Sequence, residues 1–134
     1  MYIKDIFAAK KGPVLSFEIF PPKKDSPLET IYTTVESLKH LKPDFISVTY
    51  GAGGSSKDRT VEIAALIKKK YGIESLAHLT CISSTKTEIE NLLNDLKNNE
   101  IKNILALRGD LPQDKNFKFP SPLHYNYAQD LIQQ

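Results

Sequence analysis

Polar side chains of types suited to acid–base chemistry recur near the ends of four short apolar runs. A carboxyl group stands at Glu18, an imidazole at His78 and a second carboxyl at Asp110. Carboxyl and imidazole groups are the side chains that most often transfer protons in enzymes. Each also has a purely structural interpretation: an ion pair for Glu18, a core histidine for His78 and a turn cap for Asp110. The runs carry this set of polar residues: Ser16, Glu18, Ser47, Thr49, His78, Thr80, Arg108 and Asp110.

Two further features are typical of anion recognition. Only two of the 18 basic residues are arginines, Arg59 and Arg108, so an arginine after a strand suggests a use for its planar fork of donors. Residues 51–56 (GAGGSS) resemble a phosphate-binding loop before a helix. No Gly-Lys-Ser/Thr follows, which excludes a Walker motif. The loop alone favours a tight strand-to-helix turn.

The elements that must position these residues alternate along the chain. Runs rich in branched and aromatic residues cover positions 14–20, 45–50, 75–82 and 103–107, and they recur about every 30 residues, the length of a βαβ unit. Helical segments lie between them, one amphipathic helix precedes them, and another begins near Tyr127. This order predicts parallel strands joined by helical crossovers.

Helix boundaries are marked by local signals. Ser26-Pro27-Leu28-Glu29 predicts a helix start with Ser26 as its N-cap, and Thr85-Lys86-Thr87-Glu88 predicts a capping box. Ser55 or Ser56 is the candidate cap of the middle helix, for which Tyr71-Gly72 predicts the end.

The alternation of side chains within the strands separates two architectures. One predicted face is apolar throughout: Phe17, Ile19, Ile46, Val48, Ala77, Leu79, Leu105 and Leu107. The opposite face holds the polar set, which would be buried with few partners in an open sheet covered on both sides. In a (β/α)8 barrel the same residues line the mouth, where active sites lie. The sequence therefore favours an α/β fold, the N-terminal half of a (β/α)8 TIM barrel with an extra N-terminal helix.

The length predicts an incomplete barrel. A whole barrel takes about 250 residues, and this chain has 134. We expect residues 1–134 to form a single incomplete barrel domain, from the first strand to the start of the fourth barrel helix.

Composition bounds the class of protein. The net charge is +2 and one cysteine, Cys81, is present, so we expect a cytoplasmic protein without disulfides. We expect no nucleic acid, membrane or metal partner, because neither basic–aromatic patterns, long apolar runs nor ligand clusters occur. Cys81 is predicted in the core, and His40 and His124 on the surface.

Four segments carry a resemblance to a known family. Residues 17–23 (FEIFPPK), 48–55 (VTYGAGGS), 78–81 (HLTC) and 107–112 (LRGDLP) closely resemble signature segments of methylenetetrahydrofolate reductases, in the same order and spacing. The resemblance extends from about Val14 to Leu131. Ile19 departs from the family, which commonly has phenylalanine there, but the position stays apolar.

The resemblance implies an activity and its cofactor. The family uses FAD to reduce 5,10-methylenetetrahydrofolate to 5-methyltetrahydrofolate, usually with NAD(P)H as electron donor, in one-carbon and methionine metabolism. By resemblance Glu18 is the general acid that opens the folate ring, and Asp110 lies near flavin and folate as a second catalytic residue. The positions that match FAD contacts are Thr49, Tyr50, Ala52, His78, Arg108, Gly109, Asp110 and Ala128.

Two other interpretations remain open. The chain could be a truncated, non-catalytic half barrel that only assembles with a partner, either in a homo-oligomer or with a complementing C-terminal half. It could also be an open-sheet nucleotide-binding module that uses the glycine loop.

Overall fold

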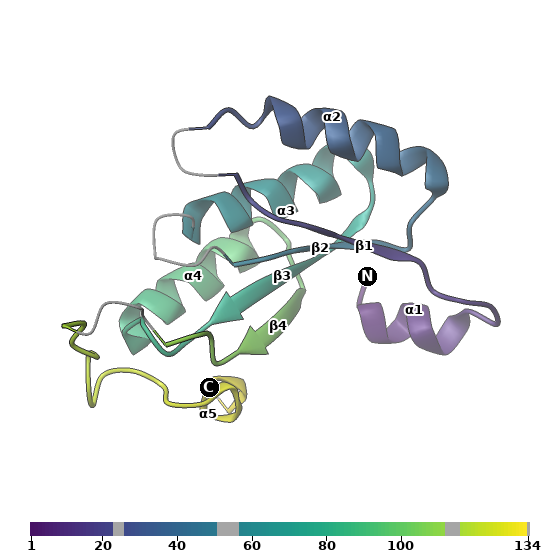
Figure 1. Ribbon diagram of the computed structural model, residues 1–134. Helices are drawn as coiled ribbons and strands as arrows, with labels where there is room; N and C mark the ends of the chain where they lie inside the picture. Colours follow the sequence, from purple (N-terminus) through teal and green to yellow (C-terminus); the bar gives the residue numbers. More distant parts are fainter. Residues whose placement is uncertain (23–25, 51–56, 112–115, 134) are drawn as a thin grey trace.

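The chain forms one parallel sheet with helices between its strands (Figure 1). The computed structural model describes residues 1–22, 26–50, 57–111 and 116–133. The predicted alternation is confirmed. The elements in chain order are α1 (Ile3–Ala9), β1 (Ser16–Ile19), α2 (Glu29–Leu38), the 3-10 turn η1 (Lys39–Leu41), β2 (Phe45–Val48), α3 (Lys57–Tyr71), β3 (Glu74–Thr80), α4 (Lys86–Asn98), β4 (Asn103–Leu107) and α5 (Ala128–Ile132).

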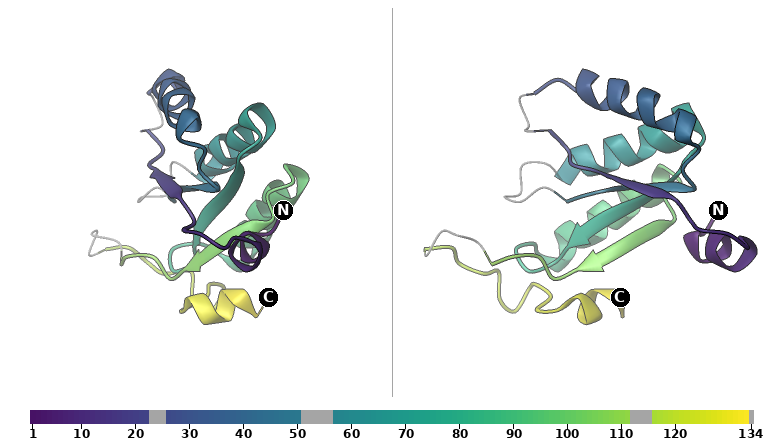
Figure 2. Two further views of the ribbon diagram at one scale, coloured as in Figure 1. Left: turned by 90° about the vertical axis from the view of Figure 1, so that its right-hand side faces the viewer. Right: turned by 45° about the vertical axis from the view of Figure 1, so that its right-hand side comes forward.

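The sheet has the strand order of half a barrel. Its strands lie in the order β1-β2-β3-β4, and each neighbouring pair is parallel. Helices α2, α3 and α4 lie on one side of the sheet, whereas α1 lies at the amino ends of the strands (Figure 2). An open sheet of the doubly wound type carries helices on both faces. The arrangement is therefore that of the N-terminal half of a (β/α)8 barrel.

The main core lies between the sheet and α2, α3 and α4. Ile19, Val48 and Ala77 are paired across β1, β2 and β3, and all three are buried. They pack with apolar residues of the helices, chiefly Ile31, Val35, Ile63, Ala64, Ile67, Ile89, Leu92 and Leu96. The predicted apolar face is thus confirmed for the first three strands.

The fourth strand corrects one prediction. Leu105 and Leu107 were expected on the helix-covered face, but they are paired with His78 and Thr80 on the opposite, inner face. The prediction assigned side chains to the two faces by alternation, as if the strand continued through Arg108 and Asp110. Because β4 ends at Leu107, alternation stops there, and Ile104 and Ala106 face the helix side instead.

The start of α4 and the end of α3 lie where the local sequence signals predict them, whereas the start of α2 does not. The capping box of α4 is present: Glu88 N donates to Thr85 Oγ1 at 3.2 Å, and Thr85 N to Glu88 Oε2 at 2.7 Å. Gly72, at φ +66°, follows the last residue of α3. The prediction for α2 is wrong, because the helix begins at Glu29 and its N-cap is Leu28.

An interaction with α3 accompanies the late start of α2. Arg59 Nη1 donates a 2.7 Å hydrogen bond to the carbonyl oxygen of Ser26. The N-cap carbonyl of an ideal helix accepts the first intrahelical hydrogen bond, a role that Leu28 takes here through Ile31 N and Tyr32 N. The candidate caps Ser55 and Ser56 lie outside the described residues.

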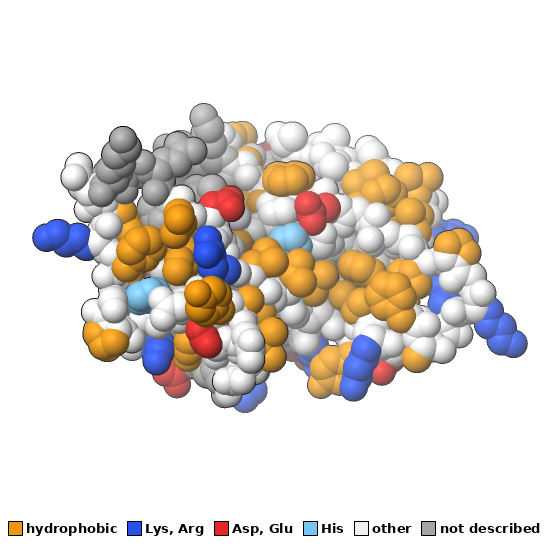
Figure 3. Space-filling view, turned by 60° about the horizontal axis from the view of Figure 1, so that its bottom comes forward, with side chains coloured by type: hydrophobic (Ala, Val, Ile, Leu, Met, Phe, Trp, Pro, Cys, Tyr) orange, Lys and Arg blue, Asp and Glu red, His pale blue; other side chains and the backbone are white. Residues whose placement is uncertain are grey.

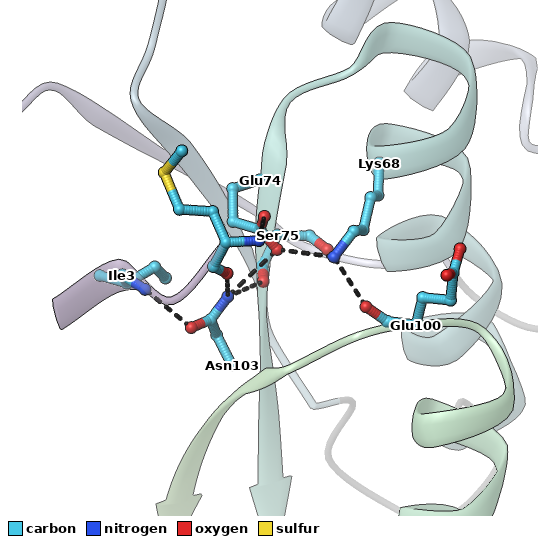
Figure 4. A network of polar contacts seen from close by, with 7 residues as sticks. Ile3, Lys68, Glu74, Ser75, Glu100 and Asn103 are labelled. Atoms are coloured by element: carbon cyan, nitrogen blue, oxygen red, sulfur yellow. Dashed lines mark hydrogen bonds and ion pairs between the residues drawn. The ribbon is translucent and has the colours of Figure 1, made fainter. Parts of the chain in front are cut away.

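A network of polar contacts closes the amino-terminal end of the sheet and attaches α1 to it (Figure 4). Asn103 Oδ1 accepts from Ile3 N at 2.9 Å, and Asn103 Nδ2 donates to Met1 O at 3.2 Å and to Glu74 Oε1 at 3.1 Å. Glu74 also receives the Met1 amine at 2.8 Å and Lys68 Nζ at 3.0 Å. We call this end of the sheet, with Glu74, Asn103 and α1, the floor.

The floor sets the charge of its carboxyl group. Burial alone would raise the pKa of Glu74, but hydrogen bonds from the Met1 amine and from Lys68 outweigh it and lower that pKa. Glu74 is therefore held as a carboxylate between two cations.

Of the two predictions that placed histidines on the surface, one is confirmed and one is wrong. His40 is exposed, as predicted. His124 is buried, and the prediction of a surface position is wrong. Its ring stacks on that of Phe119, with the ring centroids 5.8 Å apart. His124 and Thr85 also form an isolated antiparallel β-bridge. The segment before α5 therefore folds back over the start of α4.

Candidate functional site

The polar residues at the carboxyl ends of β1, β2 and β3 share the inner face of the sheet. Glu18 is paired with Ser47 across β1 and β2, and Ser47 is paired with Leu76 across β2 and β3. Paired residues of parallel strands share a face, and so do residues two apart in one strand. Leu76 therefore places His78 on the face of Glu18. We call this carboxyl-terminal end of the sheet the mouth.

Glu18 and His78 are in direct contact at the mouth. His78 Nε2 lies 3.4 Å from Glu18 Oε2, and Ser47 Oγ donates to the same oxygen at 3.2 Å. The side chain of His78 is 11% exposed and that of Glu18 is 47% exposed. The arrangement holds a carboxyl group by one oxygen while leaving much of it accessible to a small molecule.

Figure 3 views the molecule from the side on which α1 and α5 lie. Acidic and histidine side chains appear there among many hydrophobic ones. Exposed hydrophobic residues on described strands or just beyond them include Phe20 and Leu105, and Leu105 is paired with His78. The accessible carboxyl group of Glu18 thus lies in a sheet whose neighbouring surface is partly apolar.

Thr49 and Tyr50 follow β2 at the same end of the sheet. Thr49 N donates to Ile19 O at 2.9 Å, and Thr49 O accepts from Thr60 Oγ1 at 3.1 Å. Tyr50 packs against the core. These contacts fix the backbone that leads from β2 to α3. Ala52, a predicted FAD contact in the glycine loop, lies outside the described residues.

Arg108 and Gly109 form the turn after β4. Arg108 O accepts from Ile82 N at 2.9 Å, which ties the turn to the segment after β3. Gly109 has φ +86°, and a Cβ there would lie 2.9 Å from Thr80 Cβ. Glycine is therefore required by the neighbouring strand, independently of any ligand.

The side chains of this turn point into solvent. Arg108 and Asp110 are exposed. Arg108 Nε donates to the Gly109 carbonyl at 3.4 Å, and its other N–H groups have no partner among the described residues. Asp110 makes no side-chain hydrogen bond within the described ranges, so the turn-cap interpretation gains no support there.

Ala128 is the first residue of α5 and is partly buried. This helix packs through Leu131 and lies beside β4. In the described part of the chain, no hydrogen bond or ion pair joins Ala128 or Asp110 to Glu18. Of the predicted site residues, the structure thus joins Glu18 and His78 directly and places Thr49, Tyr50, Arg108, Gly109 and Asp110 just beyond strand ends.

Ser47 is the residue that sequence reasoning missed. It belonged to the predicted polar set without a role, and the structure places its hydroxyl on Glu18. Its signal was available, because a serine in an otherwise apolar strand, Phe45–Val48, marks a buried hydroxyl that needs a partner.

Other titratable groups lie apart from the mouth contacts. Cys81 is buried as predicted, and burial is the main cause that raises the pKa of its thiol. Within the described ranges, no cluster of three or more histidine, cysteine, aspartate or glutamate residues has metal-site geometry. The same ranges contain no helix that is long and apolar enough to cross a membrane.

Comparison with known proteins places these features in a family. A model of the methylenetetrahydrofolate reductase family matches residues 3–134. The 5,10-methylenetetrahydrofolate reductase of Salmonella typhimurium is 45% identical over 98 residues, covering 73% of this chain and 33% of the relative. That of Escherichia coli is 46% identical over 98 residues, with the same coverage.

A plant relative extends the match. The probable methylenetetrahydrofolate reductase (NADH) of Oryza sativa is 41% identical over 110 residues, which are 81% of this chain and 18% of the relative. The chain spans about a third of the length of the bacterial relatives. With a family model that covers nearly every residue and a half barrel of the matching fold, the chain belongs to the methylenetetrahydrofolate reductase family.

Proposed function

We propose that this chain supplies the general acid and part of the FAD site of an enzyme that reduces 5,10-methylenetetrahydrofolate to 5-methyltetrahydrofolate with NAD(P)H. The observation that carries the proposal is the accessible carboxyl group of Glu18, held by Ser47 and His78 at the mouth of a half barrel of this family. Active sites of such barrels lie at this end of the strands.

The proton transfer that we assign to Glu18 opens the five-membered ring of the folate. The O–H bond of the Glu18 carboxyl breaks, and its proton goes to the ring nitrogen that departs. The C–N bond to that nitrogen breaks with its electron pair, and the lone pair of the other nitrogen forms the C=N bond of an iminium cation. General acids of this kind contribute roughly 10²–10⁴-fold to rate.

The residues beyond the strand ends suit a dinucleotide. When bound, FAD would carry hydride from the nicotinamide donor to the folate. The exposed guanidinium of Arg108 has N–H groups without described partners, and such a fork matches phosphate oxygens. We assign Thr49, Tyr50, Ala52, His78, Arg108, Gly109 and Ala128 to FAD, by their place in the family pattern.

The second carboxyl group, Asp110, is assigned an electrostatic role. It is exposed directly after the turn that follows β4, so its charge is not neutralised by a described partner. A negative charge near the folate stabilises the iminium cation that accepts hydride. The free, buried thiol of Cys81 suits the reducing cytoplasm that we propose as the compartment.

A second candidate function is assembly without catalysis. The sheet ends at β1 on one side and β4 on the other, and Ile104 and Leu105 of β4 are 38% and 40% exposed. A partner that adds strands beside β1 and β4 would cover both edges of the sheet. Such a partner would be either a C-terminal half barrel or a second copy of the chain. This candidate predicts a colourless chain that takes up FAD only with the complementing part.

The experiment uses a completed barrel, in which this chain is fused to the remaining part of the Buchnera aphidicola relative, 43% identical over 117 residues. We expect Glu18→Gln to keep reduction of bound flavin by NAD(P)H and to lose about 100-fold or more in reduction of methylenetetrahydrofolate. Stopped-flow flavin absorbance separates the two half-reactions. Glu36→Gln, an exposed carboxyl of α2, is the matched control.

The outcomes separate the candidates. Equal loss in both half-reactions defeats the acid role of Glu18. A completed barrel that binds FAD but never reduces the folate favours the assembly candidate, and one that binds no FAD defeats the flavin proposal.

A further inference from the structure

The two carboxyl oxygens of Glu18 have different surroundings. Oε2 accepts from Ser47 Oγ at 3.2 Å and lies 3.4 Å from His78 Nε2. Oε1 has no hydrogen-bond or ion-pair partner among the described residues. The hydroxyl group of Ser47 and the imidazole of His78 thus both lie at Oε2, which distinguishes the two oxygens.

Ser47 is well placed to impose this orientation. It is 7% exposed, and it lies in β2 directly beside Glu18 in the register. Its hydroxyl lies 3.2 Å from Glu18 Oε2 and 3.4 Å from Phe17 O. One hydroxyl has one proton to donate, and a carboxylate is the stronger acceptor. Its closest partner is therefore the Glu18 oxygen.

The same asymmetry decides which oxygen carries an exchangeable proton. A protonated carboxyl group has one O–H donor and one carbonyl oxygen that only accepts. With the Ser47 hydroxyl donating to Oε2, and His78 Nε2 lying 3.4 Å from the same oxygen, Oε2 takes the accepting role, and the proton belongs on Oε1. Oε1 is then the oxygen that a substrate above the mouth would meet.

We propose that Ser47 is a positioning residue that, with His78, binds Oε2 of Glu18 and thereby presents the acidic proton on Oε1 to the substrate. This inference rests on the proposed function of Glu18 as the general acid. It adds a residue that acts through Glu18 and not on the folate itself.

The test compares Ser47→Ala with Ser47→Thr in the completed barrel. Loss of one hydrogen bond of ordinary strength corresponds to about a tenfold change in rate. We expect Ser47→Ala to lower the rate constant for folate reduction about tenfold with KM and flavin reduction unchanged. Ser47→Thr keeps a hydroxyl and should recover most of that loss. Ser75→Ala is the control, a buried serine of β3 on the helix side of the sheet.

A second measurement needs only the 134-residue chain. Infrared spectra with 13C-labelled glutamate, compared with those of Glu18→Gln, identify the Glu18 carboxylate band. We expect Ser47→Ala to shift this band and Ser75→Ala to leave it in place, because the Ser47 hydroxyl donates to the carboxyl group and Ser75 lies on the opposite side of the sheet.

The possible results are distinct. An unshifted band in Ser47→Ala removes the hydrogen bond on which the inference rests. A shifted band with equal losses in both half-reactions, or with no recovery in Ser47→Thr, shows that Ser47 acts on the fold alone and overturns the inference. A parent enzyme without folate reduction defeats the proposed function first.

Discussion

Two glutamates on the same face of the sheet have opposite surroundings. Glu74 lies at the floor, where its side chain is 10% exposed and pairs with the Met1 amine, Lys68 and Asn103. Glu18 lies at the mouth, where its side chain is 47% exposed and its partners among the described residues are the Ser47 hydroxyl and the His78 imidazole. Residues of both ends come from neighbouring parallel strands, so the difference arises from position along the strand.

The difference separates a carboxyl group that supports the fold from one available for chemistry. Two cations hold Glu74 as a carboxylate, and its contacts join α1 to β3 and β4. Glu18 has no lysine, arginine or terminal amine among its described contacts, and 47% of its side chain is exposed, so a reacting molecule can approach its carboxyl group. Barrels show the same division, with stability at the amino end and catalysis at the carboxyl end.

The largest effect on stability should come from the floor. Asn103→Ala removes an amide that satisfies Ile3 N, Met1 O and Glu74 Oε1. Buried polar groups left without partners cost about 1–3 kcal/mol, so we expect a loss of about 3 kcal/mol in the free energy of unfolding. Urea unfolding followed by circular dichroism measures it.

The matched control is Asn91→Ala, at an exposed position of α4. Its unfolding free energy should stay within about 0.5 kcal/mol of the parent chain. If Asn103→Ala cost no more than this control, the floor would not be the stabilising end of the sheet.

A smaller loss of stability is expected in the turn after β4, at the mouth. Gly109→Ala places a Cβ 2.9 Å from Thr80 Cβ in a residue with φ +86°. Strain of this kind costs about 2 kcal/mol. Gly12→Ala, where nothing lies within 4 Å of the new Cβ, should be close to neutral. Equal stability of the two variants by thermal unfolding would contradict the close approach of the turn to β3.

The smallest effect is the acid dependence of the floor. The pKa of Glu74 is lowered in the folded chain, so its contribution is complete above the ordinary value of 4.5 and is lost as pH falls through the lowered value. We expect Glu74→Gln to flatten this acid-side decline of the unfolding free energy. Urea titrations at several pH values below 4.5 measure the slope.

The control for that prediction is the exposed pair of Glu36 and Lys39 on α2 and η1. Exposed ion pairs contribute little in water, so Glu36→Gln should keep most of the parent slope. A slope flattened equally by both variants would assign the effect to net charge instead of to the floor.

Much of the fold was predictable because its signals are local. The capping box at Thr85 and Glu88, the stop at Gly72 and the apolar alternation of the first three strands depend on residues a few positions apart. Such signals act through backbone geometry and side-chain period, which the covalent chain carries with it.

The contacts that distinguish floor from mouth were decided by the tertiary structure. Asn103 binds Ile3 across 100 positions, and Ser47 binds Glu18 across 29. The sequence by itself determined which strands exist and that polar residues stand at their carboxyl ends. Where β4 ends, which oxygen of Glu18 is bound and why His124 is buried depend on the register between strands and on segments folding back over them. Those are set only when distant parts of the chain pack together, because their energies come from contacts that no local pattern contains.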